Sequence, residues 1–283
     1  MRMRTFYLFA NPVQPAGPET AARVFSRLID SGARVLCEPW LAQKLSGAVS
    51  TELSALPEET EALISIGGDG TLLRAASHAA QIKVPMLGIH TGTIGFLMEA
   101  SAANAETAVD LLLRGHYAME ERSLLACVCE GNRSLALNDC CISRGNNPGV
   151  LSISVFADGD KVYDLTGDGV LVSTPTGCTA YSLSAGGPIL RPDVPCTLIT
   201  PLCARQLLAK PVLLPASAKI TLRASARGHG GMRLSLDGQR ESALKENTDV
   251  TIETAPERAL FIRFDKTSFF DQLREKFARW NHF

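Results

Sequence analysis

The chain has 283 residues, long enough for two domains or one large domain. Hydrophobic residues make up 46% and charged residues 20%, as in an ordinary globular protein, and the net charge of −1 gives no electrostatic footprint for nucleic acid. The apolar run Phe6–Ala10 is too short for a signal peptide, and no stretch approaches the roughly 18 apolar residues of a membrane span. We therefore expect a cytoplasmic protein with no nucleic-acid or membrane partner.

The first part of the chain alternates strand and helix patterns. An amphipathic helix is predicted over Pro18–Asp30, with Gly32 just beyond its end. Strand–helix alternation of this kind predicts a largely parallel sheet with helices on its faces, a Rossmann-like α/β domain. The strands expected here are Arg4–Ala10, Ala33–Cys37, Glu61–Ile66 and Val84–Ile89, and the other helices are Thr71–Ala80 and Ala102–Leu113.

From about Leu124 the pattern changes to short strands separated by turns, which predicts a β-sandwich of two packed sheets. The tail returns to a strand, Leu260–Phe264, and a helix with Phe270, Leu273, Phe277 and Trp280 on one face, which we expect to pack on the first domain. The predicted domains are 1–122 plus 256–283, and 123–255. The strands expected in the second domain are Leu124–Cys129, Leu135–Ser143, Leu151–Ala157, Lys161–Leu165, Val170–Ser173, Lys219–Ala224, Met232–Leu236 and Asp249–Thr254.

The eight cysteines form no CxxC pair, so the sequence gives little support for a zinc site, and no protein-held metal is predicted. Several lie within apolar runs, as at Leu124–Cys129, which favours buried, reduced thiols. They are Cys37, Cys127, Cys129, Cys140, Cys141, Cys178, Cys196 and Cys203.

A glycine-rich cluster, Gly67-Gly68-Asp69-Gly70-Thr71, follows the predicted strand Glu61–Ile66 and precedes a helix. Open α/β sheets bind ligands at the carboxyl ends of their strands, and a helix N-terminus there would face a phosphate. Asp69 suits a metal-bound phosphate or the acceptance of a proton from an attacking hydroxyl. The alternative is a tight structural turn. The chain has neither GxxxxGK[ST] nor a GxGxxG that opens a helix after a strand, so any nucleotide is bound by another scheme.

A second signature runs from Asp168 to Pro188 and is dense in glycine, threonine and serine. Its hydroxyls and backbone N–H groups would hold ribose, amide and phosphate oxygens, and Ala180 with Tyr181 offers a flat surface for a base. The alternative, a purely structural loop rich in serine and threonine, would account for any four of these residues. It would not account for a segment of twenty residues that is this rich in glycine, threonine and serine.

These motifs, in this order and spacing, make the chain resemble the ATP-dependent NAD kinases. Lipid kinases of the diacylglycerol type and phosphofructokinases share the Gly-Gly-Asp-Gly cluster, whereas Thr-Pro-Thr-Gly-x-Thr-Ala-Tyr is typical of NAD kinases. The segments that carry the resemblance are Gly67–Leu73, Pro85–Ile89 with Gly95-Phe96-Leu97, Ala136–Asp139, Asp168–Pro188 and Asp237-Gly238-Gln239.

The resemblance implies transfer of the γ-phosphoryl group of ATP to the 2′-hydroxyl of the adenosine ribose of NAD, giving NADP. Asp69 would accept the proton, and Arg74, unless it is merely a solvated helix residue, would pair with phosphate oxygens. ATP would be the phosphoryl donor, with Mg²⁺ or another divalent cation arriving on it. The phosphates would meet Gly67, Gly68, Gly70 and Thr71. The residues implied to bind NAD are Asp69, Gly70, Arg74, Phe96, Asn138, Asp139, Thr166, Asp168, Thr179, Ala180, Tyr181, Ser182, Leu183, Ser184 and Gln239.

Several positions depart from the family pattern: His90 replaces Asn, Asp139 replaces Glu, Cys178 replaces Ser, and Cys203-Ala204-Arg205 replaces Cys-Pro-His. Thr93 and Thr166 stand where other members carry larger polar or basic residues. The choices of NAD or NADH and of ATP or polyphosphate therefore stay open. The alternatives are a lipid or sugar kinase sharing the first signature and a non-catalytic NAD(P)-binding sensor. Family members are usually homodimers or homotetramers, so we expect one of these.

Overall fold

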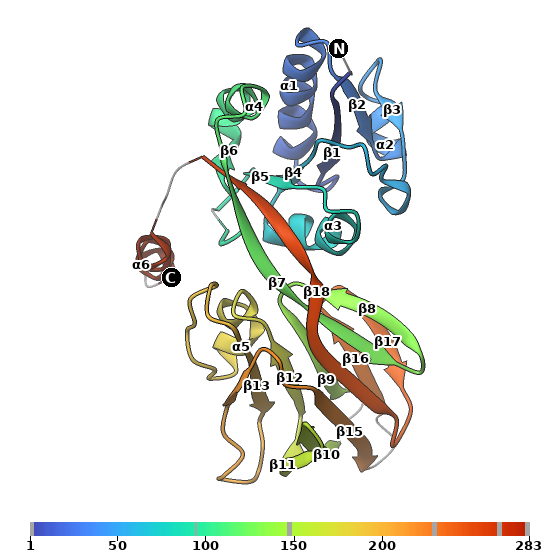
Figure 1. The fold of residues 1–283 in the computed structure, drawn as a ribbon, viewed down its shortest axis with the longest axis vertical. Coiled ribbons are helices and arrows are strands. Elements are labelled where there is room, and N and C mark those ends of the chain that lie inside the picture. Colours follow the sequence, from blue (N-terminus) through green and yellow to red (C-terminus); the bar gives the residue numbers. More distant parts are fainter. Residues whose placement is uncertain (1–2, 94, 146–148, 228–230, 265–267, 281–283) are drawn as a thin grey trace. The chain divides into compact units, whose positions relative to one another are not determined.

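The structure, a computed structural model, describes residues 3–93, 95–145, 149–227, 231–264 and 268–280. It divides into two compact units (Figure 1). Unit 1 is Met1–Glu121 with Ala259–Phe283, and unit 2 is Arg122–Arg258.

Unit 1 contains a parallel sheet in the order β3-β2-β1-β4-β5, and β18 and the short β6 also pair with β5 in parallel. Strands β1 and β4 are buried on both faces, as their largely apolar sequences favour. The strands are β1 Thr5–Ala10, β2 Arg34–Cys37, β3 Val49–Ser50, β4 Ala62–Gly67, β5 Met86–His90 and β6 Ala100–Ser101.

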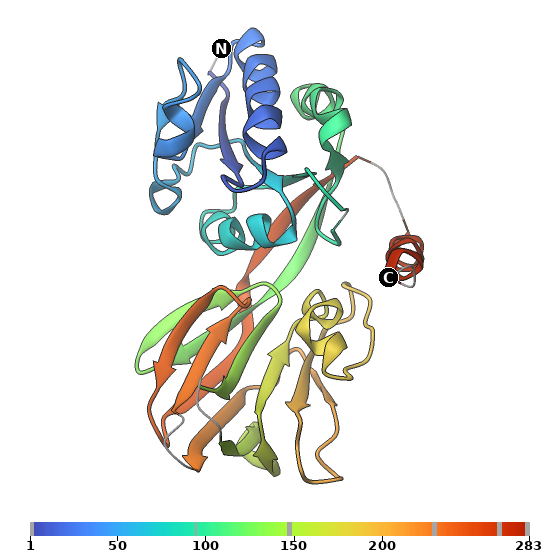
Figure 2. The same ribbon diagram turned by 180° about the vertical axis from the view of Figure 1, so that it is seen from behind.

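Helices cover both faces of this sheet. Helices α1 and α4 lie side by side (Figures 1 and 2), joined by ion pairs from Arg23 to Glu106 and from Arg27 to Asp110, and they bury one row of strand residues. Alternate residues such as Phe9 face the other way, toward α3. The helices are α1 Ala16–Asp30, α2 Pro39–Ala42, α3 Asp69–Gln81, α4 Ala105–Leu113 and α6 Phe269–Trp280, with 3-10 helices η1 Leu53–Ala55 and η2 Ala102–Asn104.

Unit 2 is a β-sandwich, drawn from green to orange in Figure 1. One sheet has the order β14-β13-β12-β9-β16-β17, the other contains β11-β10-β15-β18 with β7 and β8, and apolar side chains of both sheets form the core between them. The strands are β7 Ala118–Cys129, β8 Asn132–Ala136, β9 Asp139–Arg144, β10 Val150–Ala157, β11 Asp160–Gly167, β12 Gly169–Ser173, β13 Cys196–Leu202, β14 Val212–Pro215, β15 Ile220–Arg227, β16 Met232–Leu236, β17 Arg240–Leu244 and β18 Asp249–Arg263, with helices η3 Gly177–Thr179 and α5 Tyr181–Ser184.

The predicted fold class, a Rossmann-like α/β domain with a β-sandwich, is confirmed. Two element predictions are wrong. The expected strand Leu135–Ser143 is interrupted between β8 and β9, because the backbone turns at Leu137 and Asn138 to bond with Asp237. The expected strands Asp249–Thr254 and Leu260–Phe264 are one strand, β18. In α6, Leu273 is buried but Phe270 is 51% exposed, and the side chain of Trp280 lies outside the described residues.

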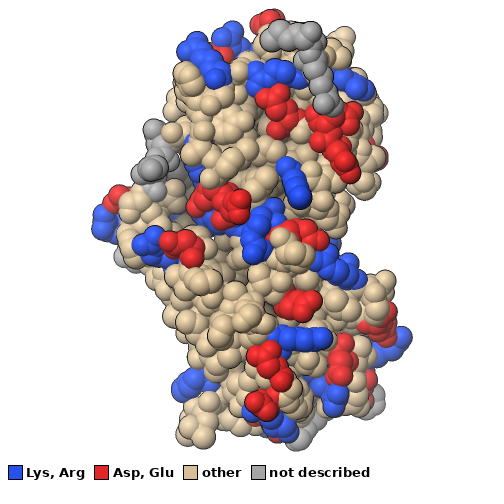
Figure 3. Space-filling view, viewed as in Figure 1, with Lys and Arg blue, Asp and Glu red and all other residues tan. Residues whose placement is uncertain are grey.

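Basic and acidic side chains are interspersed on the face seen in Figure 3, as the near-zero net charge suggests. No helix within the described ranges is long and apolar enough to cross a membrane.

Candidate functional site

The glycine-rich cluster lies where strand β4 ends and helix α3 begins. Gly68 caps the helix, and its N–H donates to Oγ1 of Thr71 at 3.4 Å. A Cβ at position 67 would lie 2.3 Å from that same oxygen, so only glycine fits there. A Cβ on Gly68 would meet no atom within 4 Å. Open space therefore lies beside Gly68 at the N-terminus of α3, where the positive end of the helix dipole favours an anion.

The Asp69 side chain is held in one orientation by the loop after β5. Its carboxylate oxygens accept hydrogen bonds from the backbone N–H of Phe96 at 2.7 Å and of Leu97 at 3.2 Å. The backbone at Gly95 lies so close that a Cβ there would fall 1.7 Å from Oδ1 of Asp69. Two donors use only part of a carboxylate's capacity, so Asp69 can still accept a proton or hydrogen bond from a ligand.

The remaining unit 1 candidates make local contacts. The Arg74 guanidinium lies 5.2 Å from the centroid of the Phe9 ring, and Arg74 is exposed. Phe96 is half-buried, and Gly70 and Thr93 are exposed. The ring Nδ1 of His90 is 2.8 Å from the Gly92 carbonyl oxygen, so a protonated Nδ1 donates to it.

In unit 2, Asn138 and Asp139 lie at the junction of β8 and β9, and Asp237 anchors their backbone. The Asp237 carboxylate accepts hydrogen bonds from the N–H groups of Leu137, Asn138 and Asp139 at 3.0, 2.7 and 3.2 Å. From the other side, Thr174 donates its N–H to the Asn138 carbonyl at 2.9 Å. Asn138 is therefore fixed between two turns distant in sequence.

Two carboxyl groups lie at this junction, of which Asp139 is buried and Asp237 is half-buried. Burial, and to a smaller extent the nearby charge of Asp237, raises the pKa of Asp139 to about 7. Burial also raises the pKa of Asp237, although the three N–H groups that it accepts act in the opposite direction. Asp139 is thus poised to change ionisation near neutral pH.

The second signature leaves β12 as a turn, continues as η3 and ends in α5. The turn packs against Asn138, since a Cβ at Gly177 would lie 2.0 Å from the Asn138 carbonyl oxygen. Tyr181 is 52% exposed, and its pKa is raised by burial first and then by nearby charges that include Asp168 and Asp139. Asp139 pairs with Ser173 at the end of β12, where the turn toward Tyr181 begins, and Asp168 directly precedes the start of the same strand.

Sequence comparisons cover both signatures. The model of the ATP-NAD kinase N-terminal domain matches residues 6–117, and that of the C-terminal domain matches residues 137–264. This chain belongs to the ATP-NAD kinase family. An NAD kinase of Symbiobacterium thermophilum is 37% identical over 98% of this chain and 99% of its own length, and one of Methanothermobacter thermautotrophicus is 33% identical over 91% and 90%.

Solved structures of NAD(H) kinases have the same fold as this family member. Yeast NADH kinase complexed with NADH superposes with a TM-score of 0.85 at 26% identity, covering 98% of this chain and 88% of that one. An NAD kinase from Archaeoglobus fulgidus in complex with ATP gives a TM-score of 0.73 at 24% identity, covering 94% and 95%.

Not every predicted site residue of this NAD kinase family member offers its side chain to a ligand. Ser182 is fully buried, and its hydroxyl lies 2.9 Å from that of Thr200. Asp168 pairs with Arg144, Nε to Oδ1, at 3.2 Å. The N–H of Thr166 donates to Gln206, and its carbonyl accepts from the N–H of Arg205. Thr179, Ala180 and Leu183 are half-buried, and Ser184 and Gln239 are exposed.

Sequence reasoning missed two features around these residues. It did not identify the Asp237 carboxylate as the anchor of Asn138, although Asp237 belongs to a segment that carries the resemblance. It also missed Arg122, a buried arginine whose Nη1 donates to the Thr176 hydroxyl at 3.3 Å. The local pattern does not single out Arg122, because it directly follows Glu120 and Glu121 near the start of the strand.

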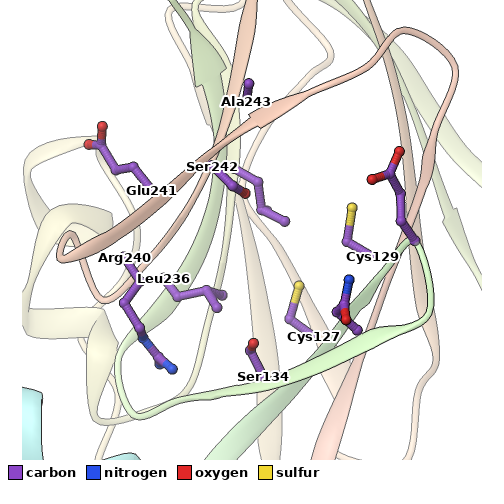
Figure 4. Close-up of a pocket in the computed structure, with 11 residues that line it drawn as sticks. Cys127, Cys129, Ser134, Leu236, Arg240, Glu241, Ser242 and Ala243 are labelled. Atoms are coloured by element: carbon purple, nitrogen blue, oxygen red, sulfur yellow. The ribbon is translucent and has the colours of Figure 1, made fainter.

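A separate pocket of about 310 Å³ lies in unit 2 beside the β7–β8 and β16–β17 hairpins (Figure 4). No predicted site residue lines it. Its lining residues are Cys127, Cys129, Glu130, Asn132, Ser134, Leu234, Leu236, Arg240, Glu241, Ser242 and Ala243.

Proposed function

We propose that this protein is an NAD kinase that transfers the γ-phosphoryl group of ATP to the 2′-hydroxyl of the adenosine ribose of NAD, giving NADP. The observation that carries the proposal is Asp69, the first residue of α3, whose carboxylate two backbone N–H groups hold beside an open helix N-terminus. Family membership supports the same activity. A lipid or sugar kinase would share the first signature but not the second.

Asp69 orients the attacking hydroxyl and takes its proton late, because a carboxylate is a weak base toward a sugar hydroxyl. The transition state of phosphoryl transfer is loose, so positioning and neutralisation of charge supply most of the catalysis. Gly67, Gly68, Gly70 and Thr71 surround the helix N-terminus that would receive phosphate oxygens.

The divalent cation is proposed to arrive on the triphosphate, as Mg²⁺ does in many kinases. The described residues contain no group of three or more His, Cys, Asp or Glu side chains arranged to hold a metal ion. A cation carried by ATP would neutralise phosphate charge.

The NAD-binding residues are proposed to gather around the anchored junction in unit 2. Asn138 and Asp139 would bind the ribose hydroxyls, and Asp168 would lie at the nicotinamide end. The fixed backbone of Asn138 and the packing of the Gly177 turn against it support this assignment. The other proposed contacts are Arg74, Phe96, Thr166, Thr179, Ala180, Ser182, Leu183, Ser184 and Gln239, where Ser182 would contribute its backbone because its hydroxyl is buried.

We also propose a cytoplasmic homodimer or homotetramer. Leu207 and Leu208, on the segment between β13 and β14, are 85% and 92% exposed, and neighbouring apolar side chains of this kind are often covered in an oligomer. The free cysteines are typical of a reducing compartment. Light scattering coupled to gel filtration measures the mass of the protein in solution, and a monomer would contradict the proposed homodimer or homotetramer.

A coupled NADP-formation assay tests the function. Purified protein with Mg²⁺ is given ATP or polyphosphate as donor and NAD, NADH, a diacylglycerol or a sugar as acceptor. NADP formed from NAD and ATP supports the proposal. Phosphorylation of the lipid or sugar alone would show that the protein is a lipid or sugar kinase. NAD binding without turnover would show that it is a non-catalytic NAD(P)-binding sensor.

Asp69→Asn tests the role of the carboxylate. We expect turnover to fall by about 10²–10⁴-fold, because asparagine keeps the size of the side chain but cannot take the proton. Asparagine can accept from only one of the two N–H groups that hold the carboxylate, so the melting temperature should fall by a few degrees while the protein stays folded at the assay temperature. Asp30→Asn, at the exposed end of α1, is the matched control and should keep full activity. Near-normal turnover of Asp69→Asn would remove this residue from the mechanism.

A further inference from the structure

Lys276 is a buried lysine that the reaction described above does not use. It lies on α6, in unit 1, and only 7% of it is exposed. Its ammonium nitrogen lies 3.2 Å from the centroid of the Phe96 ring. The face of an aromatic ring attracts a cation but offers no lone pair to accept its hydrogen bonds.

The ammonium has no hydrogen-bond acceptor or ion-pair partner among the described residues. An unpaired charge in such a place is costly, and a buried lysine normally has a carboxylate or carbonyl beside it. Burial accordingly lowers the pKa of Lys276 to about 8, against the opposing charges of Asp69 and Glu275. Its three N–H donors therefore have the face of the ring beside them and no acceptor among the described residues, and the nitrogen is not one of the fully enclosed polar atoms, so a ligand can reach it.

Lys276 belongs to the same group of contacts as Asp69. The residue beneath its ammonium, Phe96, donates its backbone N–H to the Asp69 carboxylate at 2.7 Å, and the charge of Asp69 acts on the lysine. The missing acceptor is therefore to be sought beside Asp69. A phosphoryl group supplies several anionic oxygens and would satisfy the ammonium donors.

We propose that Lys276 is a phosphate-binding catalytic residue, whose ammonium donates to an oxygen of the phosphoryl group being transferred beside Asp69. This inference rests on the proposed kinase function. No covalent bond to the lysine forms or breaks, and its charge balances the negative charge of the phosphoryl oxygens in the transition state.

A purely structural role predicts a different effect of substitution on activity. If Lys276 served only to pack α6 on Phe96, methionine would replace its methylene groups and keep the contact while removing the cost of the buried charge. Stability would hold and activity would not change. If Lys276 binds the phosphoryl group, stability would again hold, but activity would fall.

Lys276→Met is therefore compared with Arg274→Met, which removes an exposed cation from the same helix. We expect Lys276→Met to lower kcat/KM for ATP by about 10²–10³-fold, as loss of one preorganised donor does elsewhere. The KM for NAD should change less than about threefold, and the melting temperature should be equal or higher. Arg274→Met should resemble the wild type. Activity of Lys276→Met within about threefold of wild type, or a loss of activity matched by unfolding, would overturn the proposal.

A second experiment tests the contact between Lys276 and phosphate without measuring enzyme turnover. Pyridoxal 5′-phosphate, a phosphate-bearing aldehyde, condenses with an accessible neutral lysine to an imine with loss of water, and borohydride traps the product. We expect peptide mass spectrometry to find the label on Lys276, and ATP or a non-hydrolysable ATP analogue to prevent it. Labelling that ATP does not reduce, or labels only on other lysines, would contradict the phosphate contact.

The two proposals can fail separately. The wild type could form no NADP while the ATP analogue still protects Lys276 from labelling and binds Lys276→Met at least tenfold more weakly than the wild type. In that case the proposed kinase function is wrong and the phosphate site at Lys276 stands. If NADP forms and Lys276→Met behaves as the wild type in both experiments, only the lysine proposal is wrong.

Discussion

At the scale of single residues, Gly95 decides where the proposed catalytic carboxylate can lie. A Cβ at this position would fall 1.7 Å from Oδ1 and 2.2 Å from Cγ of Asp69. Gly95→Ala should therefore displace the carboxylate and lower turnover by about 10-fold to 10²-fold, since small misplacements of reacting groups are costly. Gly92→Ala is the matched control in the same loop, because a Cβ there meets nothing within 4 Å. Equal kcat values for the two variants would contradict the prediction.

Asp139 should make both NAD binding and stability depend on pH. Its pKa is about 7 in the folded protein and about 3.9 in an unfolded chain, so between these values the folded state holds a proton that the unfolded state has lost. Stability should therefore fall as pH rises from about 4 to about 7 and then level off. Over the upper part of this range kcat/KM for NAD should rise, because the ionised carboxylate accepts hydrogen bonds from ribose hydroxyls more strongly.

Asp139→Asn tests both halves of this prediction. The variant should lose the part of the pH dependence that Asp139 causes, with a melting temperature roughly 3–8 °C above wild type at pH 8 and little difference at pH 5. Thermal melts and initial rates between pH 5 and 8.5 provide the measurements. Parallel pH profiles for variant and wild type would show that Asp139 does not titrate near neutrality.

At the scale of elements, the β16–β17 turn holds the β8–β9 junction through one carboxylate. Asparagine in place of Asp237 has one oxygen for three N–H donors and adds an N–H₂ group that none of them can bind. Asp237→Asn should destabilise the protein by about 1–3 kcal/mol and raise the KM for NAD more than it lowers kcat. Asp158→Asn, in the β10–β11 turn where the carboxylate oxygen accepts one N–H from Lys219, is the control. A KM for NAD equal to that of the control would show that the anchor does not position the site.

The sequence located the strand–loop–helix at Asp69 because glycine spacing and strand patterns are local signals. It could not show that Asp237 binds Leu137, Asn138 and Asp139, since that contact joins segments about a hundred residues apart. Strand β13 was missed because Pro201 lies inside it. Strand β17 was missed because four of its five residues are exposed, so an edge strand left no alternation to detect.

At the scale of the whole molecule, the eight free cysteines differ in exposure, and these differences follow from the packing of the chain. Cys203 is exposed, Cys129 is half-buried, and the other six are buried. Burial raises the pKa of Cys37 to about 11 and that of Cys141 to about 12, so neither offers a thiolate at neutral pH. Cys127 differs from these two cysteines, because a hydrogen bond from the Cys140 thiol lowers the pKa of Cys127. Cys127 and Cys129 both line the pocket in Figure 4.

Reaction with a small aromatic disulfide reagent at pH 7.5 should therefore separate three classes of thiol. One thiol, Cys203, should react fast in the native protein, and the two pocket thiols should react slowly, at a rate limited by access through the pocket. The other five should react only in denaturant, because their side chains are buried. Cys203→Ser should abolish the fast phase and leave the slow phase unchanged. Peptide mapping assigns each phase, and fast labelling of Cys37 or Cys196 in the native protein would contradict the packing of the unit that contains it.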